Sequence, residues 1–179
     1  MPAPYPVVAI VNWLIDKNAS NPANLTHLKI QKLLYFAQGH HLAKFNAPLF
    51  EDDFQAWRYG PVVDRVYHQL KYFGGDVVDT KIQDYSAPIK PSIPFAATAA
   101  IDEDDRQTLG FLEEIWPIYS PINPWGLVSM SNRDDGPWRK IADAISSWET
   151  KSKIVPKDLI KLHFTNYLES EPPESGPSL

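Results

Sequence analysis

The chain has 179 residues, of which 44% are hydrophobic and 12% aromatic, and its formal net charge is −5. This length and composition predict one domain with a sizeable core and exclude a disordered chain. A mildly acidic protein gains little from attraction to phosphates, so general nucleic-acid binding is disfavoured.

The chain contains no cysteine, which excludes disulfides and a thiolate nucleophile. No apolar run approaches the roughly 20 residues of a membrane span. The first five residues, MPAPY, lack the basic region that opens a signal peptide. Together these features predict a cytoplasmic protein that does not enter a membrane.

The first two predicted helices are defined by the spacing of apolar residues. A helix is predicted over residues 4–17, followed by a turn over 18–24. Thr26 is a suitable N-cap for a second helix that runs to about residue 44. This second helix is apolar on two faces, which is typical of a central helix packed by neighbours on two sides. Its remaining face carries Lys29, Lys32, Phe36 and His40.

The middle of the chain is less regular. Weak alternation over residues 53–57 predicts a short strand, and Gly60 and Pro61 are expected to start a helix, because a proline costs little at the first helical position. Gly74 is expected to end that helix. A second strand is predicted near 76–82. Because neither half of the chain looks like a complete core, residues 76–100 indicate a long surface excursion within one domain.

Capping signals define the remaining helices. Asp102 and Asp105 predict the start of a helix that ends near residue 119, and shorter helices follow over 123–131 and 138–146. Pro156 is expected to start the last helix. Residues 171–179 are rich in Pro, Ser and Glu, which predicts a disordered tail. The expected fold is mainly α, with one compact helical domain over residues 1–170, a central helix over about 26–44 and a small β element near 53–57 and 76–82.

The sequence contains none of the common catalytic or phosphate-binding motifs, such as G-x-S-x-G, G-x-x-x-x-G-K-[ST] or H-E-x-x-H. We therefore expect no enzyme, no cofactor and no metal site. His40 and His41 are adjacent on a helix, whereas a helical metal pair needs a spacing near i, i+4. We expect His41 to face the core and His40 to face solvent. A hydrolase that uses His27, His40 or His68 is an alternative that no spacing supports.

Two groups of residues are candidates for binding a partner. The stripe on the second helix places an aromatic ring, Phe36, on an otherwise polar face, as interfaces often do; two solvated lysines are the alternative interpretation. The second group combines Trp, Arg and Tyr, which are enriched in binding hot spots. In that group, Trp57 could instead cap the core, with Arg58 packed against it. The candidates are Lys29, Lys32, Phe36 and His40 in the first group, and Trp57, Arg58 and Tyr59 in the second.

Three blocks of sequence carry a resemblance to a known family. They are residues 25–39 (LTHLKIQKLLYFAQG), residues 48–50 and 56–62 (PLF and AWRYGPV) followed by Tyr67, and residues 136–138 (GPW) followed by Lys140. With the last helix included, the chain resembles the SocA-like, or Panacea-domain, antitoxin family over roughly residues 5–168. The family is also described as phage-associated proteins. Its third block usually has Thr-His where this chain has Ser131 and Asn132.

The resemblance implies a mostly helical domain that neutralises a toxin, encoded beside it, by direct binding. At least one family member acts as an adaptor that delivers its toxin to a bacterial protease. The seven candidates named above would then contact the toxin, and a different set would set the fold. The fold-setting residues are Gln31, Gly60, Pro61, Pro137 and Trp138.

Two other readings are compatible with the same fold. A prophage or mobile-element protein could bind another host or phage factor. A DNA-binding autoregulator is disfavoured by the acidic balance. The sequence indicates no oligomeric state.

Overall fold

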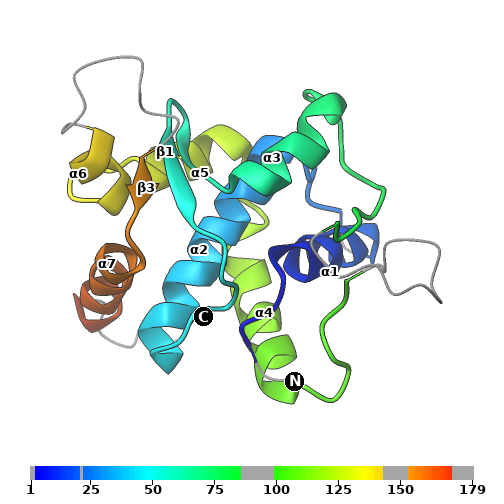
Figure 1. The fold of residues 1–179 in the computed structure, drawn as a ribbon, viewed down its shortest axis with the longest axis horizontal. Coiled ribbons are helices and arrows are strands. Elements are labelled where there is room, and N and C mark those ends of the chain that lie inside the picture. Colours follow the sequence, from blue (N-terminus) through cyan, green and yellow to red (C-terminus); the bar gives the residue numbers. More distant parts are fainter. Residues whose placement is uncertain (1–2, 21, 86–98, 143–152, 171–179) are drawn as a thin grey trace, which may run out of the picture.

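The computed structural model describes residues 3–20, 22–85, 99–142 and 153–170 (Figure 1). The described part is mainly helical, as predicted, with one small antiparallel sheet. In chain order its elements are α1 (Val7–Ser20), α2 (His27–Phe45), β1 (Phe54–Trp57), β2 (Gly60–Val62), α3 (Asp64–Leu70), the 3-10 helix η1 (Lys71–Phe73), α4 (Arg106–Tyr119), α5 (Pro124–Ser131), α6 (Pro137–Ala142), β3 (Ile154–Val155) and α7 (Lys157–Ser170).

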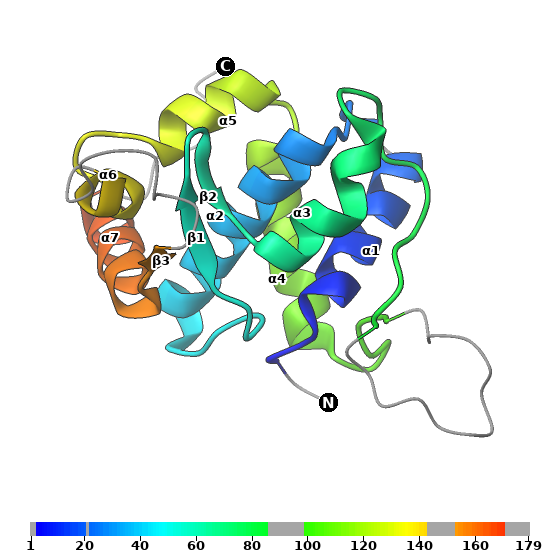
Figure 2. The same ribbon diagram turned by 45° about the horizontal axis from the view of Figure 1, so that its top comes forward.

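Helix α2 is the centre of the molecule, which confirms the prediction of a central helix. It begins at the N-cap Thr26, whose side chain accepts a hydrogen bond from the Lys29 amide, and it ends at Asn46, which adopts the left-handed conformation. Helices α1, α3, α4, α5 and α7 all pack against it (Figures 1 and 2). Every residue from Lys29 to Leu42 is buried, so the helix faces protein around its whole circumference.

The sheet has the strand order β2-β1-β3, and both pairings are antiparallel. The predicted strand near 53–57 is confirmed as β1. Because Trp57 pairs with Gly60, residues 58 and 59 form a two-residue hairpin turn between β1 and β2. Pro61 lies in β2, which is an edge strand, where a missing N–H is tolerated.

Two predictions for this region are wrong. Gly60 and Pro61 belong to a strand, and the following helix begins only at Asp64. In the described part of the chain no strand forms at 76–82, where Val77 makes only an isolated bridge with Thr26. That segment runs beside α1 and α2 instead, and the Ile82 amide donates to the Asn12 side chain at 2.9 Å.

The remaining helices follow their predicted caps. Helix α4 is capped by Asp105, whose side chain accepts from the Thr108 amide, and α5, α6 and α7 lie within a few residues of their predicted ranges. The predicted continuation of α6 to residue 146 and the predicted tail at 171–179 fall outside the described residues. Across the described ranges, none of the helices combines the length and the apolarity needed to cross a membrane.

Buried glutamine side chains hold the irregular main chain against α2. The Gln38 side chain accepts from the amides of Leu49 and Phe50 at 2.8 and 3.3 Å and donates to the Phe50 carbonyl at 2.8 Å. Gln31 makes the same kind of paired contact with the amide and carbonyl of Val63, at 2.9 and 3.2 Å. Buried main-chain groups need such partners wherever no strand lies beside them.

We therefore expect Gln38→Ala to lower the free energy of unfolding by about 3 kcal/mol, because it leaves several buried main-chain groups unpaired. Chemical denaturation monitored by circular dichroism measures this change. Gln107→Ala is the matched control, since Gln107 is exposed on α4. Equal stability of the two variants would contradict the role given to Gln38.

Candidate functional site

The four residues of the predicted polar stripe on α2 are not exposed to solvent. Lys29, Lys32, Phe36 and His40 are all buried, and none is more than 8% exposed. The expectation that they form an open binding face is therefore wrong. The physical reason is that α4, α5 and α7, which lie far along the sequence, cover this face of α2 (Figure 2).

Both lysines of the stripe donate hydrogen bonds to main-chain carbonyls. The Lys29 ammonium lies 2.5 Å from the Ala23 carbonyl oxygen and 2.6 Å from that of Ser120. The Lys32 ammonium lies 2.9 Å from the Pro61 carbonyl oxygen. Burial lowers the pKa of both groups, and that of Lys32 falls to about 7. These lysines join α2 to neighbouring segments and are unavailable to a partner.

Phe36 and His40 join α2 to α4 and α7. The Phe36 ring stacks on Tyr119, with centroids 4.3 Å apart and planes at 11°. His40 Nε2 lies 2.6 Å from the Tyr119 hydroxyl oxygen, and its ring packs edge-on against Phe164. His40 therefore faces the core, contrary to expectation. His41 is buried as expected, with Nδ1 2.7 Å from the Ala47 carbonyl oxygen.

Trp57 is part of the scaffold beneath the β1–β2 hairpin. Its indole N–H donates to the Gln55 side chain at 2.9 Å, and its ring packs on Tyr67. The Trp57 carbonyl accepts the indole N–H of Trp138 at 2.7 Å. These contacts favour the interpretation in which Trp57 caps the core.

The hairpin tip carries an exposed group that we call the aromatic cluster: Arg58, Tyr59 and Trp125. Tyr59 is 45% exposed and Trp125 on α5 is 59% exposed. The two rings meet edge to face, with centroids 5.4 Å apart and planes at 87°. The exposed Arg58 guanidinium lies 5.2 Å from the Tyr59 ring centroid. The structure thus combines two predicted residues with one from another element.

Sequence reasoning missed Trp125. The available signal was its place in the first turn of a short helix, where Leu127 and Val128 supply the buried side. What the sequence could not show was its distance from the hairpin tip, because residues 59 and 125 come together only through the packing of α5 against β2.

Gly60 is enclosed by polar groups. Its φ of +101° suits glycine. A Cβ at this position would lie 2.5 Å from Asn132 Oδ1, 2.6 Å from Lys32 Nζ and 2.8 Å from Ser131 Oγ. Asn132 thus lies at the same crowded point as the buried lysine. Gln31, Pro61, Pro137 and Trp138 are also buried, so none of the predicted fold-setting residues is on the surface.

The three histidines considered for catalysis have separate surroundings. His27 is buried against Tyr67, His40 contacts Tyr119, and His68 pairs with Asp64 on the exposed side of α3 at 3.4 Å. Burial lowers the pKa of His27 to about 4. Within the described ranges, no group of three or more His, Asp or Glu side chains could hold a metal ion.

Arg58, Tyr59 and Trp125 belong to the three residue types that are enriched in the hot spots of protein interfaces. The model of the family described as "Antitoxin SocA-like, Panacea domain" matches residues 30–139, which is more than half of the chain. The chain belongs to this family. The matched region includes the whole aromatic cluster and Gly60.

A named relative supports the same assignment. Antitoxin SocA of Caulobacter vibrioides (strain NA1000 / CB15N) is 29% identical over 135 residues, which cover 75% of this chain and 69% of the relative. No solved structure matches the chain.

Gly60→Ala should destabilise the protein by at least about 2 kcal/mol, because the methyl group meets three polar atoms and the backbone is strained for an L-residue. Gly110→Ala is the matched control: Gly110 lies within α4 with open space around it, and alanine there should stabilise by about 0.5–1 kcal/mol. Thermal unfolding of both variants tests the pair. A neutral Gly60→Ala would contradict the crowding described above.

The buried amine of Lys32 makes stability depend on pH. Its pKa is about 7 in the folded chain and 10.5 ordinarily, so the unfolded chain binds more protons between these values. Raising the pH therefore increases the free energy of unfolding, by up to about 1.4 kcal/mol per pH unit for one proton. The range from pH ~7 to ~9.5 stays below the titration of tyrosines.

Urea unfolding across this range should show a clearly smaller slope for Lys32→Met than for the wild type. Burial also lowers the pKa of Lys29, so part of the slope should persist. Lys71→Met, which changes an exposed lysine on η1, should leave the slope unchanged. An unchanged slope in Lys32→Met would show that its amine is not the source.

Proposed function

We propose that this chain is an antitoxin that neutralises a cognate toxin by direct protein–protein binding, with the aromatic cluster at the centre of the interface. The observation that carries the proposal is the exposure of Arg58, Tyr59 and Trp125 as one contiguous group in the family-matched region. Trp, Tyr and Arg supply most hot spots of protein interfaces. A stable complex would bury about 1,600 Å² in total around them.

The rigidity of the turn that carries the aromatic cluster supports a binding role. The turn that carries Arg58 and Tyr59 is only two residues long, and its ends are fixed by the Trp138–Trp57 hydrogen bond and by the enclosed Gly60. Tyr59 is further restrained by the Trp125 ring. A rigid side chain loses little entropy when a partner covers it, so more of its contact energy contributes to affinity.

The burial of the α2 stripe reduces the number of predicted residues that can contact a toxin directly. Lys29, Lys32, Phe36 and His40 cannot contact a toxin while the described packing holds, so their effect on binding would be indirect, through stability. Trp57 supports the hairpin through its hydrogen bonds and its packing on Tyr67, so we propose no direct toxin contact for it. Among the residues predicted from the sequence, Arg58 and Tyr59 are the direct contacts that we propose.

Tyr59→Ala and Trp125→Ala should each weaken toxin binding by about 30-fold or more, which corresponds to a hot-spot loss of about 2 kcal/mol. Both variants should keep the melting temperature, because the two rings are half-exposed. Tyr72→Ala is the matched control: Tyr72 is 85% exposed on η1 and also lies beneath a lysine ammonium.

The partner for this test is the product of the neighbouring open reading frame. It should be toxic when expressed alone, harmless with the wild-type chain, and purified together with it. Tyr59→Ala should restore toxicity. A neighbour that is harmless alone would instead favour a protein that binds another host or phage factor. If the toxin disappears from cells that contain the protease but persists in cells that lack it, the chain delivers the toxin to that protease.

A further inference from the structure

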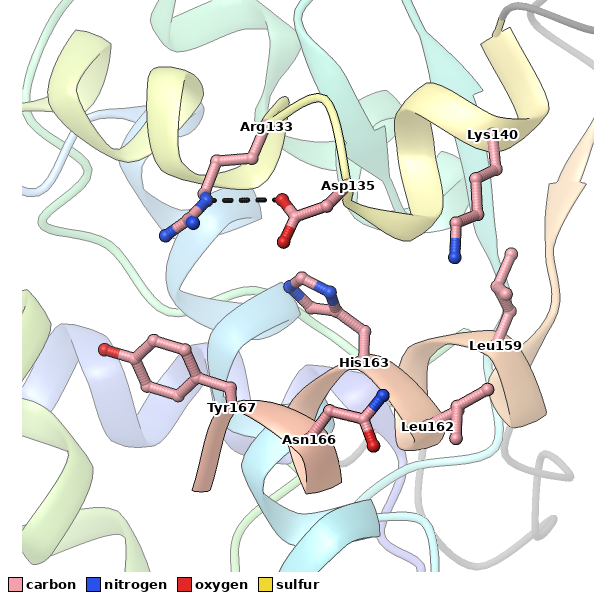
Figure 3. A pocket seen from close by; sticks show the side chains of 8 residues that line it. All are labelled: Arg133, Asp135, Lys140, Leu159, Leu162, His163, Asn166 and Tyr167. Atoms are coloured by element: carbon pink, nitrogen blue, oxygen red, sulfur yellow. Dashed lines mark ion pairs between the residues drawn. The ribbon is translucent and has the colours of Figure 1, made fainter. Parts of the chain in front are cut away.

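A second surface feature shares no residue with the aromatic cluster. A pocket of about 470 Å³ opens between α7 and the turn that joins α5 to α6 (Figure 3). This volume is within the range of ligand-binding pockets. One wall carries charged side chains from the turn and from α6; the other is a face of α7. The lining residues are Arg133, Asp135, Lys140, Leu159, Leu162, His163, Asn166 and Tyr167.

The pocket has an excess of positive charge although the whole chain is acidic. Arg133 pairs with Asp135, Nε to Oδ1, at 3.3 Å. The Lys140 ammonium has no ion pair or hydrogen bond with any residue that the structure describes. One unmatched cation therefore faces the pocket, and an anionic group would complete it.

His163 lies between these charges. Figure 3 shows its ring projecting from α7 into the space below Asp135, with Lys140 reaching down beside it from α6. Burial is the main reason that the pKa of His163 is lowered; Arg133 and Lys140 lower it further, whereas Asp135 raises it. The imidazole is therefore neutral at pH 7 and can offer a hydrogen bond to an entering carboxylate.

The α7 wall is also apolar. Leu162 is 56% exposed, and Leu159 lies on the same face. Behind the pocket lies a chamber of about 50 Å³, lined by Tyr35, Phe36 and Tyr119 among others, which shares Arg133, His163 and Tyr167 with the outer pocket. The buried Tyr35 hydroxyl has no hydrogen-bond partner in the described structure. A chamber this small takes a water molecule or a methyl group, not a large side chain.

We propose that this pocket binds an acidic segment of the protein partner, with a carboxylate between Lys140 and His163 and an apolar side chain on Leu159 and Leu162. The inference rests on the proposed function in taking the partner to be a protein. A phosphate dianion fits less well, because Asp135 faces the same space and leaves one net positive charge. The exposed Leu162 and the half-buried Leu159 add an apolar surface that an inorganic anion would leave uncovered.

The test uses the full chain and the blocked peptide acetyl-Glu-Leu-Glu-Leu-amide, with its Gln-for-Glu analogue as the uncharged control. Histidine ring signals are followed by NMR and assigned to His163 with His163→Gln. The Glu peptide should shift the His163 signal and raise its pKa, because a carboxylate favours the imidazolium. His68, on α3 beside Asp64, should not respond and is the internal reference.

Lys140→Ala should weaken peptide binding at least about 5-fold, as expected for a charge-assisted contact, and Lys71→Ala, at an exposed lysine of η1, should leave it unchanged. Three results would each overturn the inference: no response at His163, an equal response to the Gln peptide, or an equal response to inorganic phosphate. The last would identify an unspecific anion site.

The outcome is separable from that of the proposed function. If Tyr59→Ala abolishes neutralisation while Lys140→Ala changes neither neutralisation nor the His163 response, the pocket assignment is wrong and the antitoxin role stands. If the neighbouring gene product is harmless but the Glu peptide still acts through Lys140, the pocket assignment stands and the antitoxin role fails.

Discussion

The burial of α2 from Lys29 to Leu42 is the constraint on which the rest of this structure depends. Most polar side chains on a helix surrounded by protein need hydrogen-bond partners, because an unpaired buried group costs about 1–3 kcal/mol. Here several partners are main-chain groups of neighbouring segments: Gln38 binds Phe50, Gln31 binds Val63, and Lys32 binds Pro61 of β2. The same contacts satisfy those segments, so α2 is both the core and the template that positions the chain around it.

This constraint determines what the surface can display. Lys32 and Gln31 fix the main chain on either side of Val62, and Gly60 is enclosed by Lys32, Ser131 and Asn132. These contacts fix the inner side of the β1–β2 hairpin, and its turn presents Arg58 and Tyr59 at the surface, where Tyr59 contacts Trp125. Lys32 is the residue of the polar stripe that contacts this hairpin, through the Pro61 carbonyl. If Lys32 were solvated, β2 would lose its hydrogen bond from the Lys32 ammonium to the Pro61 carbonyl.

Local signals in the sequence were sufficient for most of the helices, because caps such as Thr26 and Asp105 act within one turn. They were insufficient for the stripe, because periodicity cannot distinguish a lysine in water from one bonded to a buried carbonyl. The contact that buries His40 comes from Tyr119, 79 positions away. The same limit applies to Trp125, whose neighbour Tyr59 lies on a separate element. Gly60 was predicted to start a helix, but glycine is required there because a side chain would collide with Asn132 and Lys32.

Net charge is a poor guide to the sign of an individual site on this protein. The total of −5 is spread over the surface, and at physiological ionic strength its effect is screened beyond about 8 Å. Within the α7 pocket the balance is set by a few groups, and Arg133 and Lys140 outweigh Asp135. An acidic chain can therefore receive an acidic segment, provided that the segment reaches the pocket. In the proposed complex, the contact at the aromatic cluster would hold the partner on this chain and so raise the effective concentration of the acidic segment at the pocket.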